Sequence, residues 1–349
     1  MVVTSDREVK GPSALPARSP QRDRGGSTHH RAAEAVMTEH HTVAEHDVPP
    51  VLVAVGHDPM DAALELAVHV AVREGCGLHL LHVLHHVAQG PEMVLVDIVD
   101  LEHAARLVLG AAEERARDLL PEGLPVSTQL VWGGPVSSIV ATSKDTRMVV
   151  LQRRPLSRVL RVVTRSTSSG VAAHAHVPVV SVPARWSPPG SGDAVPVVTV
   201  GVDVPERAEN VLRAAVHEAR GRGATLRVLH TWSFPGAYDD IIVSRVEHER
   251  WTERATSDIR EALSGLGEEA TGLTVEIEAR HAFPGDALIQ AARTSDLLVI
   301  GRHDPLVPAG SHLGPVARAV LREAVCPVML ADPRPRHHWT THRQHADVV

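Results

Sequence analysis

Cysteine is scarce in this chain of 349 residues, with Cys76 in one half and Cys326 in the other. Two distant cysteines exclude a disulfide framework and a four-cysteine zinc site. Aromatic residues make up only 2% of the chain, which argues against the stacking platforms that bind single-stranded nucleic acid. The net charge of -7 also disfavours a general nucleic-acid binder, because such proteins carry an excess of basic side chains.

Long apolar runs and enzyme signatures are missing as well. No apolar run approaches the roughly 20 residues that span a bilayer, and the N-terminal sequence lacks the apolar stretch of a secretory signal. We therefore expect a cytoplasmic protein with neither a membrane nor nucleic acid as a partner. The sequence contains no GxxxxGK[ST], GxGxxG, GxSxG or HExxH motif. Without a nucleophile, an acid–base pair or a metal cage, it predicts a non-catalytic protein without a metal.

The composition divides the chain into two ordered stretches flanked by polar segments. An internal methionine leaves open whether translation starts at Met1 or Met37. Prolines, glycines and charged residues without periodicity mark the polar segments. We expect a disordered N-terminal tail, a first domain, a linker, a second domain and a frayed histidine-rich tail, at 1–48, 49–183, 184–195, 196–332 and 333–349.

Short apolar runs alternate with helical spacing in both stretches, which is typical of α/β domains with a parallel sheet and helices on both faces. Pro135 and Pro284 should open equivalent helices. Glycines should end the first helix of each stretch, at Gly75 and Gly77 and again at Gly221 and Gly223. The expected strands are 51–55, 78–83, 126–131, 148–151 and 177–182, followed by 197–202, 226–231, 273–279, 297–300 and 326–331.

The second stretch repeats the first. His82 and His230 occupy equivalent strand positions 148 residues apart, and Pro135 and Pro284 are 149 residues apart. A near-constant offset across five strands indicates a duplication. We interpret both histidines as strand-end residues with satisfied hydrogen bonds rather than as catalytic groups.

Ligands of open parallel sheets bind outside the carboxyl ends of the strands, where the strand order reverses. In the second repeat Asp203, Thr231 and Gly301 stand at these ends. Gly301 and Gly314 permit close backbone approach, and a helix that starts near Gly314 offers free N–H groups to an anion. Arg302 and His303 could add donors. A glycine that ends a strand is common, so this pattern alone is a weak signal.

Each repeat resembles the universal stress protein family, and the chain resembles its tandem actinobacterial type. The residues that carry the resemblance are VTVGVD at 198–203, LRVLHTW at 226–232, SDLLVIGRHD at 295–304 and LGPVARAVLREAVCPV at 313–328. The resemblance implies two flavodoxin-like domains, of the adenine nucleotide α-hydrolase type, each with a five-stranded parallel sheet. It also implies pairing through the edge strand near the C-terminus of each domain.

The resemblance further implies an ATP site in the second repeat. ATP-binding members carry Gly-x-x-Gly, nine residues, then Gly-Ser or Gly-Thr, with an Asp after the first strand. Gly301, Gly314 and Asp203 match this pattern, but Asp304 replaces the second glycine and Pro315 the hydroxyl residue. The expected nucleotide-binding residues are Asp203, Thr231, Gly301, Arg302, Gly314 and Val316.

The first repeat departs further from the pattern. Gln152, Pro155 and Arg165 replace the three glycines, and Gly56 stands in place of the Asp. Side chains at these positions would block the bare backbone that a phosphate needs, so we expect a degenerate site. The first repeat would then serve as a structural mate of the second.

The function implied by the resemblance is a non-catalytic role in stress adaptation, with an adenine nucleotide such as ATP bound in the second repeat. One alternative is a nucleotide-free interaction scaffold whose arginines meet an acidic partner; these are Arg153, Arg154, Arg158, Arg161 and Arg165. A lesser alternative is a weak nucleotide hydrolase or transferase. Intramolecular pairing of the domains, a homodimer and an unidentified protein are the expected partners.

Overall fold

The computed structural model describes residues 48–85, 98–153, 167–188, 194–232, 247–302 and 313–331. All of the described residues belong to one compact unit. The two predicted tails and the middle of the predicted linker therefore stay expectations.

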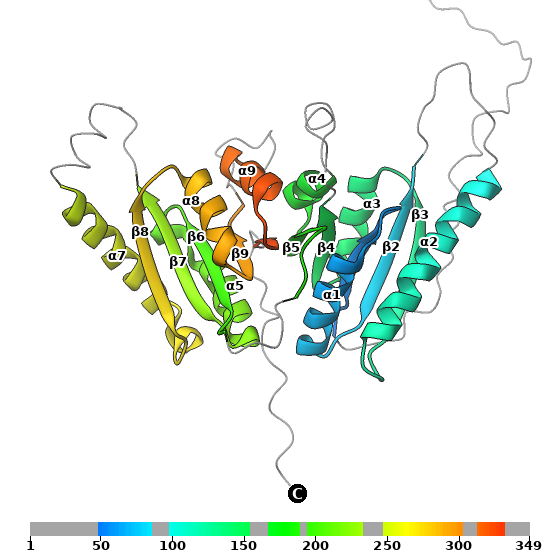
Figure 1. Ribbon diagram of the computed structural model, residues 1–349, viewed down its shortest axis with the longest axis horizontal. Helices are drawn as coiled ribbons and strands as arrows, with labels where there is room; N and C mark the ends of the chain where they lie inside the picture. The colour runs from blue at the N-terminus through cyan, green and yellow to red at the C-terminus, as the bar shows by residue number, and fades with distance from the viewer. Residues whose placement is uncertain are drawn as a thin grey trace, which may run out of the picture. The chain divides into compact units, whose positions relative to one another are not determined.

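The first half alternates strands and helices as the sequence predicts. Its five strands are parallel and lie in the order β3-β2-β1-β4-β5 (Figure 1). The elements are β1 (Val51–Val55), α1 (Asp61–Glu74), β2 (Leu78–Leu84), α2 (Ile98–Leu119), β3 (Val126–Trp132), α3 (Pro135–Thr142), β4 (Met148–Arg153), α4 (Thr167–His174) and β5 (Val179–Pro183).

The second half repeats this order. Its strands are also parallel to one another and follow as β10-β9-β6-β7-β8. The elements are β6 (Val197–Val202), α5 (Glu209–Arg222), β7 (Thr225–Trp232), α7 (His248–Ser264), β8 (Val275–His281), α8 (Pro284–Ala291), β9 (Leu297–Ile300), α9 (Pro315–Glu323) and β10 (Val328–Leu330). The α/β class and the duplication are thus confirmed.

The two halves share one sheet. β5 and β10 pair in antiparallel register, with Val179 opposite Leu330 and Ser181 opposite Val328. Both strands are fully buried, so each would leave a row of unpaired backbone groups if its half stood alone. Their pairing satisfies those groups and makes a single ten-stranded sheet. The pairing through the edge strand near the C-terminus of each domain, which the family resemblance implies, is confirmed, and it joins the two five-stranded parallel sheets.

Alternate strand residues feed two apolar layers. On one face, buried residues such as Val51 and Val198 pack against α1, α2, α5 and α7. On the other face, residues such as Leu52 and Leu298 pack against α3, α4, α8 and α9. Helices therefore cover both faces of the sheet, which explains why its central strands read as continuous apolar runs.

Glycine ends the first helix of each half, as predicted, but not at every predicted position. Gly75 and Gly223 cap α1 and α5 with left-handed φ angles of 63° and 59°. Gly221 instead lies inside α5, which is a correction. A Cβ atom at Gly221 would lie 2.6 Å from Cδ of Arg73, so this glycine makes room for a side chain from the other half. Pro135 and Pro284 open α3 and α8 as expected.

Candidate functional site

The candidate site lies at the carboxyl edge of the second half of the sheet. β6 lies between β9 and β7, so the residues that follow these three parallel strands share one edge. Asp203 follows β6 and is exposed, Thr231 is the penultimate residue of β7, and Gly301 follows β9 and is exposed. The strand order reverses between β6 and β9, where open α/β sheets bind ligands. The structure thus brings these three predicted residues to one edge.

The N-terminus of α9 reaches the same edge. α9 leads into β10, which runs parallel to β9, so the helix runs back along the sheet and begins at the carboxyl ends of the strands. Gly314 precedes it with an extended backbone, and Pro315 occupies its first turn. Val316 follows and packs against the apolar layer. The first-turn N–H groups have no partner within the helix and favour an anion.

In the first repeat a side chain fills the corresponding space. Gln152, the equivalent of Gly301, accepts a hydrogen bond from the backbone N–H of Ala63 at 3.2 Å through Oε1. Its Nε2 donates to the carbonyl oxygen of Pro59. Ala63 is the third residue of α1, so the amide of Gln152 caps one of the N–H groups that the helix leaves unpaired.

In the second repeat this space is open at Gly301. The equivalent of Ala63 is Val211, the third residue of α5. Among the described residues, a Cβ atom built on Gly301 would meet only the Cβ of Val211, at 4.0 Å, which is an ordinary contact distance. No side chain at position 301 therefore covers the start of α5, in contrast to the first repeat.

The side chain of Arg302 turns toward the other repeat. Its guanidinium donates to the carbonyl oxygen of Val177 at 2.6 Å and to that of Ala175. Both carbonyls lie just after α4, where a helix end attracts a cation. Of the predicted site residues, Arg302 therefore has only its backbone at the carboxyl edge of the second repeat. Its guanidinium forms hydrogen bonds with the first repeat.

Arg153, the first-repeat equivalent of Arg302, makes the reciprocal contact. It donates to the carbonyl oxygen of Leu321 at 2.5 Å and to that of Ala324, at the C-terminal end of α9. Ala324 is the equivalent of Ala175, because these two residues are 149 positions apart, as are Arg153 and Arg302. We call Arg153 and Arg302 the arginine clamps. Burial lowers the pKa of Arg153 from its ordinary value.

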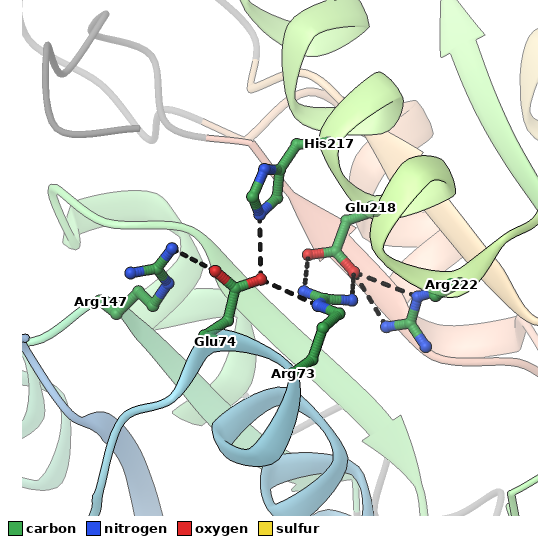
Figure 2. A network of polar contacts seen from close by, with 6 residues as sticks. All are labelled: Arg73, Glu74, Arg147, His217, Glu218 and Arg222. Atoms are coloured by element: carbon green, nitrogen blue, oxygen red, sulfur yellow. Dashed lines mark hydrogen bonds and ion pairs between the residues drawn. The ribbon is translucent and has the colours of Figure 1, made fainter. Parts of the chain in front are cut away.

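A buried ionic network joins α1 to α5 (Figure 2). Glu218 is 1% exposed and accepts two hydrogen bonds from Arg73, at 2.8 and 2.9 Å. Arg222 donates to the same carboxylate at 2.9 and 3.1 Å. Burial alone would raise the pKa of Glu218, but the charges of Arg222 and Arg73 and the hydrogen bond from Arg73 lower that pKa to about 2. Both oxygens of the buried carboxylate are therefore compensated.

Glu74 forms the second half of this network. It accepts hydrogen bonds from Arg73 at 2.8 Å, from His217 at 3.0 Å, and from Arg147. Burial would raise its pKa, yet the hydrogen bond and charge of His217 and the charges of the two arginines lower the pKa to about 2. Figure 2 shows Arg73 between the two carboxylates. The network thus ties the repeats together on the helical layer, away from the crevice.

The equivalent strand histidines behave alike at one nitrogen. Nδ1 of His82 lies 2.9 Å from the carbonyl oxygen of Val55, and Nδ1 of His230 lies 3.0 Å from that of Val202. A carbonyl can only accept, so both histidines carry their proton on Nδ1. The interpretation as hydrogen-bonded strand-end residues is borne out for this atom.

Sequence reasoning missed the arginine clamps and the ionic network. The signal for the clamps was the recurrence of arginine at an offset of 149 residues, at Arg153 and Arg302. No sequence signal indicated the ionic network, because Arg73 and Glu74 resemble the solvated end of a helix. Arg153, one member of the predicted acidic-partner patch, instead donates to the second repeat. The remaining predicted residues lie outside the described part of the chain, as does the histidine-rich tail; they are Arg154, Pro155, Arg158, Arg161, Arg165, His303 and Asp304.

Thiol reactivity, metal binding and membrane crossing can each be checked in the structure. Burial raises the pKa of Cys326 to about 12 and raises that of Cys76 as well, so neither thiol is prepared for reaction. In the described part of the chain, no group of three or more His, Cys, Asp or Glu side chains is placed to hold a metal. Within the same residues, no helix is both long and apolar enough to cross a bilayer.

The fold defines a tandem α/β protein of the doubly wound class. At the strand ends, Gln152 caps a helix in the first repeat, and Gly301 stands at the equivalent position of the second. Residues 48–183 and 196–332 each match the universal stress protein family. The chain belongs to this family.

Individual proteins agree with this assignment. The chain is 30% identical over 280 residues to a universal stress protein of Mycolicibacterium smegmatis, covering 78% of this chain and 93% of that protein. A universal stress protein of Mycobacterium tuberculosis is 27% identical over 276 residues, covering 78% and 92%. The crystal structure of a universal stress protein from Archaeoglobus fulgidus aligns with a TM-score of 0.61 at 18% identity, over 81% of this chain and 95% of that one. This structural likeness shows the fold.

Proposed function

We propose that the protein is a non-catalytic stress-adaptation protein of the cytoplasm that binds an adenine nucleotide such as ATP in its second repeat. The nucleotide would lie across the carboxyl ends of β6, β7 and β9. Asp203 and Thr231 would face the nucleoside, and the backbone at Gly301, Arg302, Gly314 and Val316 would face the phosphates.

One observation carries this proposal: the crevice is filled by Gln152 in the first repeat and left open by Gly301 in the second. Two helix starts, those of α5 and α9, border the opening and both favour negative charge. The match of Asp203, Gly301 and Gly314 to the nucleotide-binding pattern of the family supports an adenine nucleotide over other anions. The family relationship supports the role in stress adaptation.

Equilibrium dialysis with labelled ATP, ADP and AMP tests the proposal. The full chain should bind one nucleotide, and Gly301→Trp should weaken binding at least tenfold, or by about 1.4 kcal/mol, because the indole would occupy the opening. Gly110→Trp is the matched control, since Gly110 lies on α2 with nothing within 4 Å of its Cβ position. This control should bind nucleotide like the unaltered chain.

Two results would point elsewhere. Equal binding by the unaltered chain and Gly301→Trp at millimolar nucleotide would favour the nucleotide-free scaffold. Turnover of ATP that disappears in Asp203→Ala would favour the hydrolase or transferase alternative. Circular dichroism of every variant establishes that a loss of binding is not a loss of fold.

A further inference from the structure

His82 has a buried nitrogen without a partner. The residue is 2% exposed, and among the described residues nothing forms a hydrogen bond with its Nε2. Buried polar atoms in folded proteins almost always have a partner, so each exception calls for an explanation such as a bound water or ion. The neighbouring strand histidine shows the usual situation: His79 contacts Ser127 at 2.8 Å and Gln129 at 3.1 Å with its two nitrogens.

The hydrogen bond at the other nitrogen determines the chemistry of this atom. Nδ1 of His82 donates to the carbonyl of Val55, which leaves Nε2 with a lone pair. A metal-ligating histidine typically donates its second N–H to a backbone carbonyl or carboxylate in this way. Burial lowers the pKa of His82, the hydrogen bond to Val55 opposes this, and the nearby His57 and His85 lower the pKa further. Metals bind the neutral form of an imidazole, and the hydrogen bond to Val55 places the Nε2 lone pair on the free side of the ring.

A second imidazole, that of His57, lies beside the ring of His82. The ring centroids of His57 and His82 are 5.0 Å apart, with an angle of 79° between the ring planes. Two imidazoles on one tetrahedral zinc, with Zn–N distances of about 2.0–2.1 Å, also have centroids about 5 Å apart. His57 is exposed in the turn after β1, whereas Nε2 of His82 is buried. Rotation of the His57 ring would therefore have to admit the metal.

We propose that His57 and His82 bind a borderline divalent transition metal such as Zn²⁺ at the carboxyl edge of the first repeat. Imidazole nitrogen suits zinc, copper and nickel. The two histidines supply two ligands, and water or an external donor completes the coordination, since the described residues supply no third protein ligand. The site is independent of the nucleotide crevice and departs from the expectation, drawn from the sequence, that the protein binds no metal.

The second repeat contains a natural control for this site. His230 makes the same Nδ1 hydrogen bond, to Val202. The position equivalent to His57, two residues after that carbonyl, is Val204. The second repeat therefore keeps the strand histidine but lacks the second imidazole, so it should not bind the metal.

Calorimetric titration with Zn²⁺ tests the proposal in the full chain. The background variant should carry asparagine at the tail histidines His337, His338, His342 and His345, which would otherwise add adventitious sites. His57→Asn should lose one equivalent of zinc or weaken its binding at least tenfold, whereas His230→Asn should leave the isotherm unchanged. Because the side chain of His57 is exposed, its replacement should not affect folding. Equal isotherms for the two variants would overturn the proposal.

Anomalous diffraction at the zinc edge locates the metal directly. Crystals of the full chain soaked in zinc chloride should show a peak about 2.1 Å from Nε2 of His82. A peak confined to other histidines, or an ordered water at Nε2 in the presence of zinc, would show that the unpaired nitrogen has an ordinary solvent partner and would refute the site.

Discussion

The two repeats have the same fold and differ in what fills the edge of the sheet. In the first repeat, Gln152 bonds to the start of α1; in the second, Gly301 leaves the start of α5 uncovered. The same position thus supplies an internal cap in one copy and an opening in the other. Under the proposed function, the first repeat has lost its ligand site because one of its own side chains occupies the position of the ligand, and the helix start keeps a hydrogen-bond partner.

The largest expected effect comes from breaking the connection between the repeats. Arg73→Ala removes the partner that Glu218 and Glu74 share and leaves a buried carboxylate undercompensated. We expect the free energy of unfolding to fall by about 3–5 kcal/mol, measured by urea unfolding. Arg117→Ala is the control, because Arg117 makes an exposed i,i+4 pair with Glu113 that is worth about 0.5 kcal/mol.

The outcome for Arg73→Ala also sharpens the comparison. If the repeats depend on the network for their association, the variant should unfold in two transitions rather than one. A loss as small as that of Arg117→Ala would show that the β5–β10 pairing and the arginine clamps connect the repeats without the network.

The arginine clamps test whether the repeats support each other equally. Arg153→Ala and Arg302→Ala each remove two charged hydrogen bonds to carbonyls at a helix end, and each should lower the free energy of unfolding by about 1–3 kcal/mol. Thermal unfolding followed by circular dichroism measures both. A markedly larger loss for one variant would show that the two contacts are not equivalent, and a loss of nucleotide binding in Arg302→Ala beyond its loss of stability would assign its side chain to the crevice.

The smallest expected effects come from exchanging the residues at the compared position. Gln152→Gly should lower the free energy of unfolding by about 1 kcal/mol, because Ala63 loses a capping partner. Gly301→Gln should raise the free energy of unfolding if the new amide forms a hydrogen bond with the backbone N–H of Val211. The same variant should abolish nucleotide binding. Urea unfolding and equilibrium dialysis on both variants measure these changes. Nucleotide binding that survives Gly301→Gln would contradict the placement of the ligand at this edge.

Much of the fold could be predicted from the sequence, because it depends on local patterns. The order of the strands and helices could be predicted from three signals. These are the short apolar runs, the prolines that open helices, such as Pro135, and the constant offset between the two copies. Gln152 stands where a glycine was expected; that it blocks a phosphate site was predicted and stays a prediction. Its role as a helix cap was not predicted, since the hydrogen bond to Ala63 spans 89 residues.

The side-chain contacts between the repeats, unlike the edge-strand pairing that the family resemblance implied, were beyond sequence reasoning for a physical reason. Arg73 and Glu218 are 145 residues apart, and charged residues at the ends of amphipathic helices are usually solvated. Gly221 looked like a helix terminator, whereas it makes room for Arg73 inside α5. Such pairs depend on how the helices of the two repeats pack against each other, which the local periodicity of the sequence does not encode.

The antiparallel joint between β5 and β10 has a consequence for how the two copies can evolve. Because both strands belong to one polypeptide, their association is intramolecular and does not weaken on dilution, unlike that of two separate subunits. The stoichiometry of the two kinds of repeat is fixed at one to one. Mutations can therefore specialise either copy without the risk of pairing two altered copies, and a chain with unlike halves is the natural product of that arrangement.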